Sequence, residues 1–257
     1  MAKRQRVDAR LVAEGLAPDL PKARALVMAG QVVAGERRVD KPGELVGADT
    51  LLRLKGRAAR SFVSRAGHKL EGALAARRID PAGLICLDVG ASTGGFTDCL
   101  LQHGAARVYA VDVGHGHLDW RLRQDPRVVN LERTDARAID TENIPEIIDL
   151  LVADVSFVSL WRVLAPAVGR LRPGGFALLL IKPQFEVAAD EVGEGGIIRD
   201  PALWERTLAE AEAEAVALGL VVEAIERSVL PGTRGNVEFV LVGRRGTPGD
   251  HPEESTC

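Results

Sequence analysis

From about residue 61 onward, short apolar runs alternate with segments of helical period, and this alternation is the strongest constraint on the fold. The first run, LICLDVGA, leads through a glycine-rich turn into the helical segment FTDCLLQHG. The later runs with strand character are RVYAVDVG, RVVNLER, IDLLVADV and FALLLIKP. Strands that alternate with helices predict an α/β fold with a doubly wound, mostly parallel sheet.

The carboxyl-terminal part shows a second pattern. Residues 200–219 form the clearest predicted helix, with Asp200 as its cap, Pro201 at its first position and Gly219 as its terminator. Two strands follow, VVEAIERSVL and VEFVLVG, joined by the turn PGTRGN. Consecutive strands joined by a short turn pair antiparallel, so we expect this final pair, with its antiparallel last strand, to form one edge region of the sheet. The tail, residues 245–257, has no core residues and is expected to be disordered.

The amino-terminal part is built differently. Two helical segments, RVDARLVAEGLA and DLPKARALVMAG, precede short β pieces in QVVAGERRVD and TLLRL. This order predicts a small α+β domain at residues 1–56, a basic linker at 57–60 and a large domain at 61–244. Residues 1–60 contain 13 Lys and Arg against 7 Asp and Glu, a net charge of +6, whereas the rest of the chain carries −9. A basic domain beside an acidic one favours a polyanionic partner, with chance composition as the alternative.

Basic side chains of the small domain are expected to cluster on its helices and to contact RNA. They are Arg4, Arg6, Arg10, Lys22 and Arg24. Arg65, with His68 and the basic linker, extends the expected RNA surface toward the large domain. Ordinary solvated side chains are the alternative for each of these residues.

The stretch LDVGASTGGFTD places a glycine turn between a strand and a helix, which is the usual setting of a nucleotide site. Glycine lets the backbone pass close to a ligand without a collision at Cβ. The spacing departs from the dinucleotide pattern G-x-G-x-x-G, so the turn alone predicts a nucleotide site without deciding the nucleotide. The residues of this stretch expected at the site are Asp88, Gly90, Ala91, Ser92, Thr93, Gly94, Gly95 and Phe96.

Acidic residues follow the next two strands. Asp112 ends the second strand, where a carboxylate can accept hydrogen bonds from both ribose hydroxyls of a cofactor, and Val113 lies beside it. Asp135, after the third strand, is placed to reach an adenine edge. Asp88, inside the first strand, is expected to organise the turn by accepting backbone N–H bonds.

Four charged residues occupy the ends of separate predicted elements. Lys69 lies on the helix before the first strand, Asp154 and Lys182 end the fourth and fifth strands, and Glu238 lies on the last strand. Because the carboxyl ends of parallel strands line the ligand crevice, Asp154 and Lys182 are expected at the same rim as the glycine turn. Taken singly, each of the four has an ordinary explanation as a solvated or strand-end residue.

As a set, these motifs resemble the TlyA family of ribosomal RNA 2′-O-methyltransferases, within the wider FtsJ-like group. The resemblance covers nearly the whole chain and is carried by RVDARL, SRAGHKL, LDVGASTGGFT, VADVSF, KPQFE and GNVEF. It implies a Rossmann-like class I methyltransferase fold with S-adenosylmethionine as cofactor. It also implies a catalytic tetrad formed by Lys69, Asp154, Lys182 and Glu238, with Asp154 at the cofactor as well. The wider group often has a proline where this chain has Ser92 and Thr93.

The resemblance extends to the small domain and to the partners. The amino-terminal part looks like an S4-type RNA-binding domain, whose hallmark is echoed by Gly30-Gln31-Val32 and Gly35. The expected partners are ribosomal RNA and ribosomal subunits, with cytidine as the modified nucleotide. The residues leave the role of Lys182 open. A base must be neutral, whereas a lysine is normally charged at neutral pH and would then orient the ribose oxygen while Asp154 holds the geometry.

Composition narrows the class of protein. Cys86, Cys99 and Cys257 show no paired spacing, which argues against a disulfide scaffold or a zinc finger, and we expect no metal. The longest apolar run, FALLLI, is far below the roughly 20 residues of a membrane helix, so we expect a cytoplasmic protein without a membrane partner. The rival functions are a membrane-active haemolysin, a non-enzymatic RNA-binding assembly factor and an NAD-dependent oxidoreductase. The glycine spacing and the four charged residues favour the methyltransferase.

Overall fold

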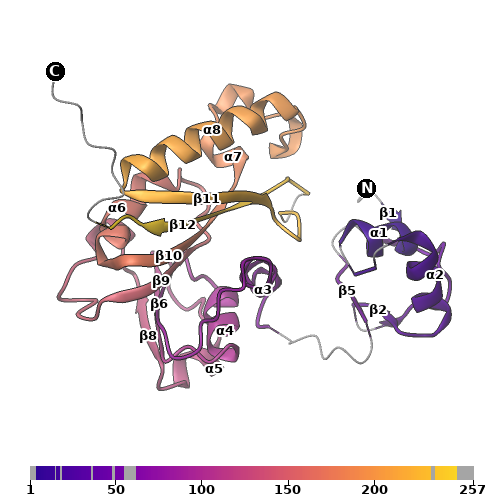
Figure 1. Cartoon of the computed structure of the whole chain (residues 1–257), viewed down its shortest axis with the longest axis horizontal. Coiled ribbons are helices and arrows are strands. Elements are labelled where there is room, and N and C mark those ends of the chain that lie inside the picture. The colour runs from indigo at the N-terminus through magenta and orange to yellow at the C-terminus, as the bar shows by residue number, and fades with distance from the viewer. Residues whose placement is uncertain are drawn as a thin grey trace. The chain divides into compact units, whose positions relative to one another are not determined.

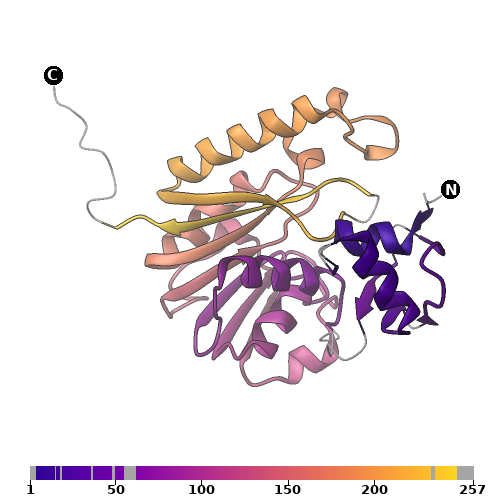
Figure 2. The ribbon, with the colours of Figure 1, turned by 45° about the vertical axis from the view of Figure 1, so that its right-hand side comes forward.

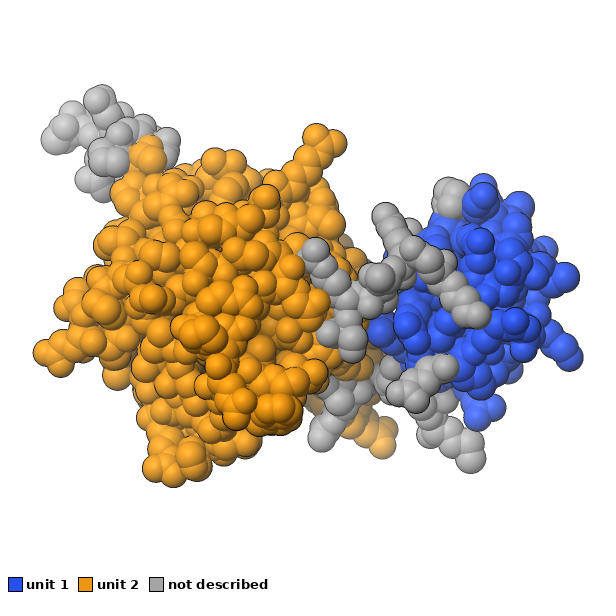
Figure 3. Space-filling view, turned by 90° about the horizontal axis from the view of Figure 1, so that it is seen from below, with its two compact units in different colours: residues 1–61 blue, residues 62–257 orange. Residues whose placement is uncertain are grey.

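The chain divides into two compact units, residues 1–61 and residues 62–257, which are coloured separately in Figure 3. The structure is a computed structural model that describes residues 4–14, 16–17, 19–35, 37–47, 50–54, 62–232 and 235–247. The predicted linker, residues 57–60, lies outside the described residues, and so do residues 248–257 of the predicted disordered tail.

The first unit combines helices with short antiparallel strands (Figure 1). Its elements are β1 (Arg4–Arg6), α1 (Val7–Ala13), α2 (Leu20–Met28), β2 (Val32–Ala34), β3 (Arg37–Arg38), β4 (Leu45–Gly47) and β5 (Leu52–Leu54). β1 pairs with β4, and β2 lies between β3 and β5. Asp19 caps α2, since its carboxylate accepts the Lys22 amide at 2.7 Å. The apolar sides of both helices close a small core that includes Val7, Leu11 and Val27.

Arg10 does not lie on an exposed RNA surface, which corrects its predicted role. Its side chain is buried, with 5% of the residue exposed. The guanidinium pairs with Glu14 and donates to the backbone oxygens of Gly47 at 2.7 Å and Thr50 at 2.8 Å. Arg10 therefore fastens α1 to the end of β4, and its hydrogen bonds are taken by the protein.

The remaining basic residues are exposed but do not all lie on helices. Arg4 and Arg6 belong to β1, whereas Lys22 and Arg24 belong to α2. Arg6 and Arg24 both pair with the buried carboxylate of Asp8, at 2.7 and 3.1 Å, and about half of each arginine side chain remains exposed. These two arginines therefore have a structural role whether or not they meet RNA.

One seven-stranded sheet organises the second unit. Its strands are β6 (Ile85–Val89), β7 (Arg107–Asp112), β8 (Val128–Glu132), β9 (Ile148–Ala153), β10 (Leu171–Ile181), β11 (Leu220–Arg227) and β12 (Phe239–Arg245). They lie in the order β11-β12-β10-β9-β6-β7-β8, and β12 runs antiparallel to both of its neighbours. This confirms the mostly parallel sheet with an antiparallel last strand. The chain passes from β6 to β7 on one side and later to β9 on the other, so the switch point lies at the carboxyl end of β6.

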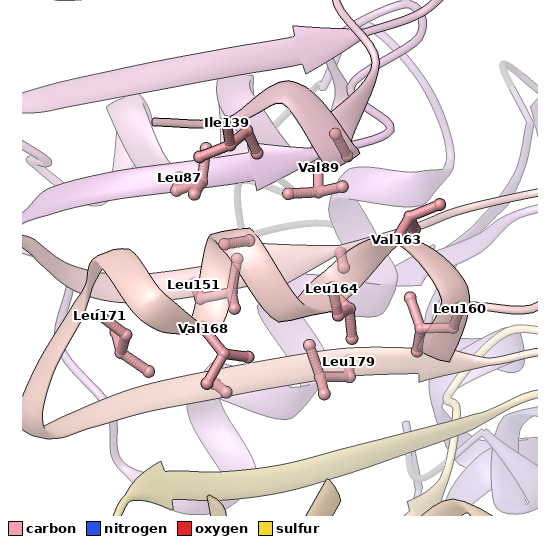
Figure 4. Packing of buried hydrophobic residues seen from close by; sticks show 14 of the residues in the cluster. Leu87, Val89, Ile139, Leu151, Leu160, Val163, Leu164, Val168, Leu171 and Leu179 are labelled. Atoms are coloured by element: carbon pink, nitrogen blue, oxygen red, sulfur yellow. The ribbon is translucent and has the colours of Figure 1, made fainter. Parts of the chain in front are cut away.

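Helices cover both faces of this sheet, as a doubly wound fold requires. Alternate residues of a strand point to opposite faces. Leu87, Leu151 and Leu179 pack in the same cluster as α6 (Trp161–Arg170) and α8 (Pro201–Ala217), a packing that Figure 4 shows around α6. Cys86, Leu150 and Leu178 pack with α3 (Ala66–Arg77), α4 (Gly95–Gln102) and α5 (Trp120–Gln124). Figure 2 shows α8 and α3 on opposite sides of the sheet.

The predicted helix at 200–219 is α8, and Asp200 caps it through the Ala202 amide at 2.9 Å. Two local features were not predicted. β10 begins at Leu171, earlier than its apolar run suggests, and a single-turn helix, α7 (Pro183–Glu186), follows it directly. Four residues are too few to show a helical period. In the described part of the chain, no helix is both long and apolar enough to cross a membrane.

Candidate functional site

The ends of the central strands bring three of the four predicted charged residues to one rim of the sheet. Asp154 follows β9 and Lys182 follows β10, each by one residue. The two strands are parallel neighbours, with Ala153 opposite Leu179. Glu238 precedes β12 and does not lie on it, which corrects the predicted position. Because β12 is antiparallel and pairs Phe239 with Ile181, its start lies at this same rim, beside Lys182.

Lys69 and Glu238 form a buried ion pair. The Nζ atom of Lys69, on α3, lies 2.5 Å from Oε2 of Glu238, and the two residues are only 6% and 3% exposed. Gly232 packs against the same carboxylate, because a Cβ atom at that position would collide with Oε1 of Glu238. Each charge can stay buried because its partner neutralises it. Since Lys69 lies on α3 and Glu238 directly precedes β12, the pair joins these two elements.

Lys182 and Asp154 form a second ion pair beside the first. The Nζ atom of Lys182 lies 2.5 Å from Oδ1 of Asp154 and donates a hydrogen bond of 2.6 Å to Oγ of Ser156. Oδ1 of Asp154 accepts no hydrogen bond from the described residues, so its contact with Lys182 is electrostatic. One hydroxyl and one carboxylate thus orient the ammonium.

The glycine turn follows β6 at the switch point of the sheet. Gly90 has a φ of +81°, and a Cβ atom there would lie 2.8 Å from the backbone oxygen of Asp154. Only glycine allows the turn after β6 to pass this close to the end of β9. Gly94 has a φ of +92° and packs against Leu118 and Leu122. Its requirement for glycine comes from that packing, because Gly94 lines neither of the two cavities at the turn.

A first cavity of about 590 Å³ opens on one side of the turn. Of the predicted cofactor residues, Gly90, Ser92, Asp112, Val113, Asp135 and Asp154 line it. Asp112 holds the cavity wall together by accepting the amides of Ser92 at 2.8 Å and Gly114 at 2.6 Å. Each carboxylate oxygen has a second acceptor position, so Asp112 can still accept ribose hydroxyls. Asp135 is held by Arg137, whose side-chain hydrogen bonds lower the pKa of the Asp135 carboxyl to about 2.

A second cavity of about 210 Å³ contains the four charged residues. The other predicted residues that line it are Asp88, Ala91, Thr93, Gly95, Phe96 and Arg65, with Gly90 and Ser92 shared between both cavities. The guanidinium of Arg65 donates to the backbone oxygen of Pro231. Arg65 therefore joins the segment before α3 to the loop before β12, and its contact with RNA stays a prediction.

Asp88 is buried and polar, and its hydrogen bonds, which include a backbone N–H bond as expected, go to Thr97 on α4. Oδ2 accepts the hydroxyl of Thr97 on α4 at 2.7 Å, while Oδ1 has no hydrogen-bond partner among the described residues. Burial raises the pKa of the Asp88 carboxyl to about 7, and the negative charges of Asp154 and Asp112 add to this effect. The residue thus anchors α4 to β6 more than it organises the turn.

Replacing Asp88 by asparagine is expected to stabilise the protein at alkaline pH. Below pH 4 the carboxyl is neutral in the folded and the unfolded chain. Between about pH 4 and 7 only the unfolded chain ionises, so the wild type loses stability as pH rises through the raised pKa. Asp88→Asn lacks this loss and should exceed the wild type by about 2–4 kcal/mol at pH 8, with little difference at pH 4. Urea unfolding at both pH values measures the difference, and two parallel pH profiles would contradict it.

A third cavity of about 420 Å³ adjoins the second and shares Ser156, Lys182 and Glu238 with it. Sequence reasoning missed Ser156 and Phe157 as individual site residues, although both belong to the VADVSF motif. Phe157 is 91% exposed and has a φ of +69°, an uncommon backbone conformation for a large side chain. Its ring lies 5.5 Å from that of Phe185, centroid to centroid. An exposed aromatic residue in a strained loop beside the charged rim is the signal that points to a substrate.

Comparisons with known proteins show which family and which folds the chain resembles. The sequence profile of the FtsJ-like methyltransferase family matches residues 62–245. The 16S/23S rRNA (cytidine-2′-O)-methyltransferase TlyA of Mycobacterium tuberculosis is 48% identical over 94% of this chain and 90% of its own length. A solved structure from Streptococcus thermophilus, provisionally named a hemolysin, has a TM-score of 0.72 at 40% identity and covers 98% of this chain and 91% of that chain. An S-adenosylmethionine dependent methyltransferase of Mesorhizobium loti, 17% identical, has a TM-score of 0.53 over 70% of this chain and 99% of that chain, which shows a common fold.

Proposed function

This chain belongs to the FtsJ-like methyltransferase family, and we propose that it transfers a methyl group from S-adenosylmethionine to the ribose 2′-oxygen of a cytidine in ribosomal RNA. The observation that carries the proposal is the convergence of Lys69, Asp154, Lys182 and Glu238 on one cavity beside the glycine turn. These four residues come from distant parts of the sequence, and two ion pairs hold them there. The length of the match to a relative named for this reaction supports the choice of substrate.

The residues of the two cavities at the turn suit S-adenosylmethionine. Gly90 lines both cavities, and Asp112 offers acceptors for ribose hydroxyls in the larger one. Val113, which is 71% exposed, offers an apolar surface for adenine in the same cavity. When bound, the cofactor supplies an electrophilic methyl group on a sulfonium.

Lys182 is the residue that we place at the reacting ribose oxygen. Lys182 borders both the second cavity and the third cavity. We place the substrate nucleotide in the third cavity. Ser156 and Asp154 hold the Lys182 ammonium in one orientation, which lowers the entropic cost of positioning the hydroxyl. Two roles fit this geometry, and they differ in where the hydroxyl proton goes. Either Lys182 accepts the proton, or it stays charged and stabilises the developing alkoxide while the proton leaves to another acceptor.

The first unit supplies the proposed RNA surface. We propose that residues 1–56 form an S4-type RNA-binding domain, and the exposed Arg4 and Lys22 are the basic side chains best placed to neutralise phosphates there. Arg6 and Arg24 can contribute through the exposed half of their side chains. Each phosphate contact removed should weaken RNA binding and make the affinity less dependent on salt.

Methyl transfer with separated ribosomal subunits tests the proposal. The purified protein is incubated with S-adenosylmethionine labelled on its methyl group and with small or large subunits, and the RNA is then extracted. Label in the RNA of at least one subunit is the expected result. A protein that binds the cofactor yet labels neither subunit would contradict the proposed substrate.

Replacing Gly90 by alanine is expected to weaken cofactor binding at least about tenfold. The variant must adopt a left-handed φ, which costs about 1–2 kcal/mol, and its Cβ atom also meets the backbone of Asp154. Gly174→Ala is a matched control, because Gly174 has a φ of +71° and open space around the added Cβ atom. Calorimetric titration of both variants with S-adenosylmethionine separates the effects. Equal affinities for the two variants would show that the close approach at Gly90 is not needed.

A further inference from the structure

The third cavity contains two carboxamide side chains that differ in their hydrogen bonding. Asn236 is 4% exposed and uses both ends, since Nδ2 donates to the Gly196 oxygen at 2.8 Å and Oδ1 accepts the Ile198 amide at 2.9 Å. Oε1 of Gln184, in contrast, is buried and has no partner among the described residues. A buried acceptor without a donor costs about 1–3 kcal/mol. Asn236 therefore builds the wall of the cavity, whereas Oε1 of Gln184, which has almost no exposed surface, gains a donor only when its side chain turns toward a ligand in the cavity.

The position of Gln184 relates this acceptor to the reacting group. Gln184 lies on α7, two residues after Lys182 and directly before Phe185. Lys182 and Gln184 line the same cavity, and the neighbouring rings of Phe157 and Phe185 give that cavity flat apolar walls. A nucleotide whose ribose oxygen meets Lys182 would place its base in this space, among the aromatic rings and the carboxamide. RNA bases outside a helix are commonly read by hydrogen bonds to their Watson–Crick edge in such pockets.

We propose that Gln184 is the residue that selects the target base, with Oε1 accepting a hydrogen bond from the exocyclic amino group of cytosine. The inference rests on the proposed function and names a determinant of its specificity. A carboxamide offers an acceptor beside a donor, and cytosine offers an amino donor beside the N3 acceptor, so the two edges are complementary. Uracil presents a carbonyl oxygen beside an N3–H donor, which only a carboxamide turned over by 180° would match, so the selection of cytosine requires that Gln184 is held in one orientation. A pair of such bonds discriminates by about 1–3 kcal/mol, which corresponds to a factor of about 10–100 in rate.

The test compares cytidine with uridine at the modified position. Once that position is mapped, ribosomal subunits are prepared with either nucleotide there, and single-turnover methylation rates are measured for four proteins. Wild type should prefer cytidine about 10- to 100-fold. Gln184→Leu should bring the two rates close together, because leucine has no hydrogen-bonding group. Gln184→Glu keeps an acceptor oxygen and should retain the preference for cytidine. Gln124→Leu, an exposed glutamine on α5 outside the three cavities, should behave as wild type.

The possible outcomes distinguish a failure of this inference from a failure of the proposed function. A Gln184→Leu protein that keeps the full preference for cytidine, while binding S-adenosylmethionine normally, would overturn the inference. A wild type that methylates both nucleotides equally would also overturn it and would leave methyl transfer to ribosomal RNA intact. A wild type that labels neither subunit would contradict the proposed function itself.

Discussion

Replacing Lys182 by alanine is expected to slow methyl transfer by a factor of about 10²–10⁴, which is the usual contribution of a positioned acid–base group. The Lys182 ammonium is the oriented cation between the second and third cavities, and alanine removes it. Lys182 does not line the first cavity, where we place most of the cofactor. The affinity for S-adenosylmethionine should therefore stay close to that of the wild type. Single-turnover rates and a binding titration measure the two quantities separately. A Lys182→Ala protein with full turnover would contradict the account of the site.

Lys182→Arg distinguishes the two roles of the lysine. An arginine stays charged at every working pH and cannot accept a proton, yet it can donate hydrogen bonds to an alkoxide. If Lys182 acts by its positive charge, the arginine variant should recover part of the activity that alanine loses. If Lys182 is the base, the two variants should be equally slow.

Breaking the buried ion pair of Lys69 and Glu238 is expected to cost about 3–5 kcal/mol of stability. Lys69→Met leaves the Glu238 carboxylate buried without its cation, at a position where Gly232 packs against it. The double variant Lys69→Met/Glu238→Leu removes both charges and should regain most of the loss. It should remain inactive, because the new packing lacks the two charges that line the second cavity.

Urea unfolding of both single variants and the double variant completes a double-mutant cycle for this pair. The exposed pair of Arg206 and Glu191, 2.6 Å apart, serves as the control. Arg206→Met should change the free energy of unfolding by less than about 1 kcal/mol, as is usual for surface ion pairs. A Lys69→Met protein as stable as Arg206→Met would show that the pair is not buried in solution.

Long periodic segments made the large domain predictable from its sequence. Each of the seven strand segments predicted for it contains a strand, and Asp200, Pro201 and Gly219 marked the bounds of α8. Short elements were missed because they carry no readable period. β1 and β4 have three residues each, and their strand character comes from pairing between segments 39 to 43 residues apart in the sequence.

The site was predictable where it depends on strand ends and unpredictable where it depends on contacts between distant residues. Parallel strands place Asp154 and Lys182 at one rim by topology alone. Nothing local shows that Glu238 pairs with Lys69, or that Gly94 is required by two leucines. Arg10 was misplaced for the same reason, since its burial depends on backbone oxygens 37 and 40 residues away.

The central claim is that the tetrad directs the methyl group to a ribose oxygen, and alkaline hydrolysis of the labelled RNA tests it most directly. Alkali cleaves RNA through the free 2′-hydroxyl, so a methyl group on that oxygen protects the adjoining phosphodiester. We expect the label in alkali-resistant dinucleotides that contain cytidine. The Lys182→Ala protein should produce almost no labelled dinucleotides. Label recovered in single nucleotides, which means that the methyl group is on a base, would contradict the account.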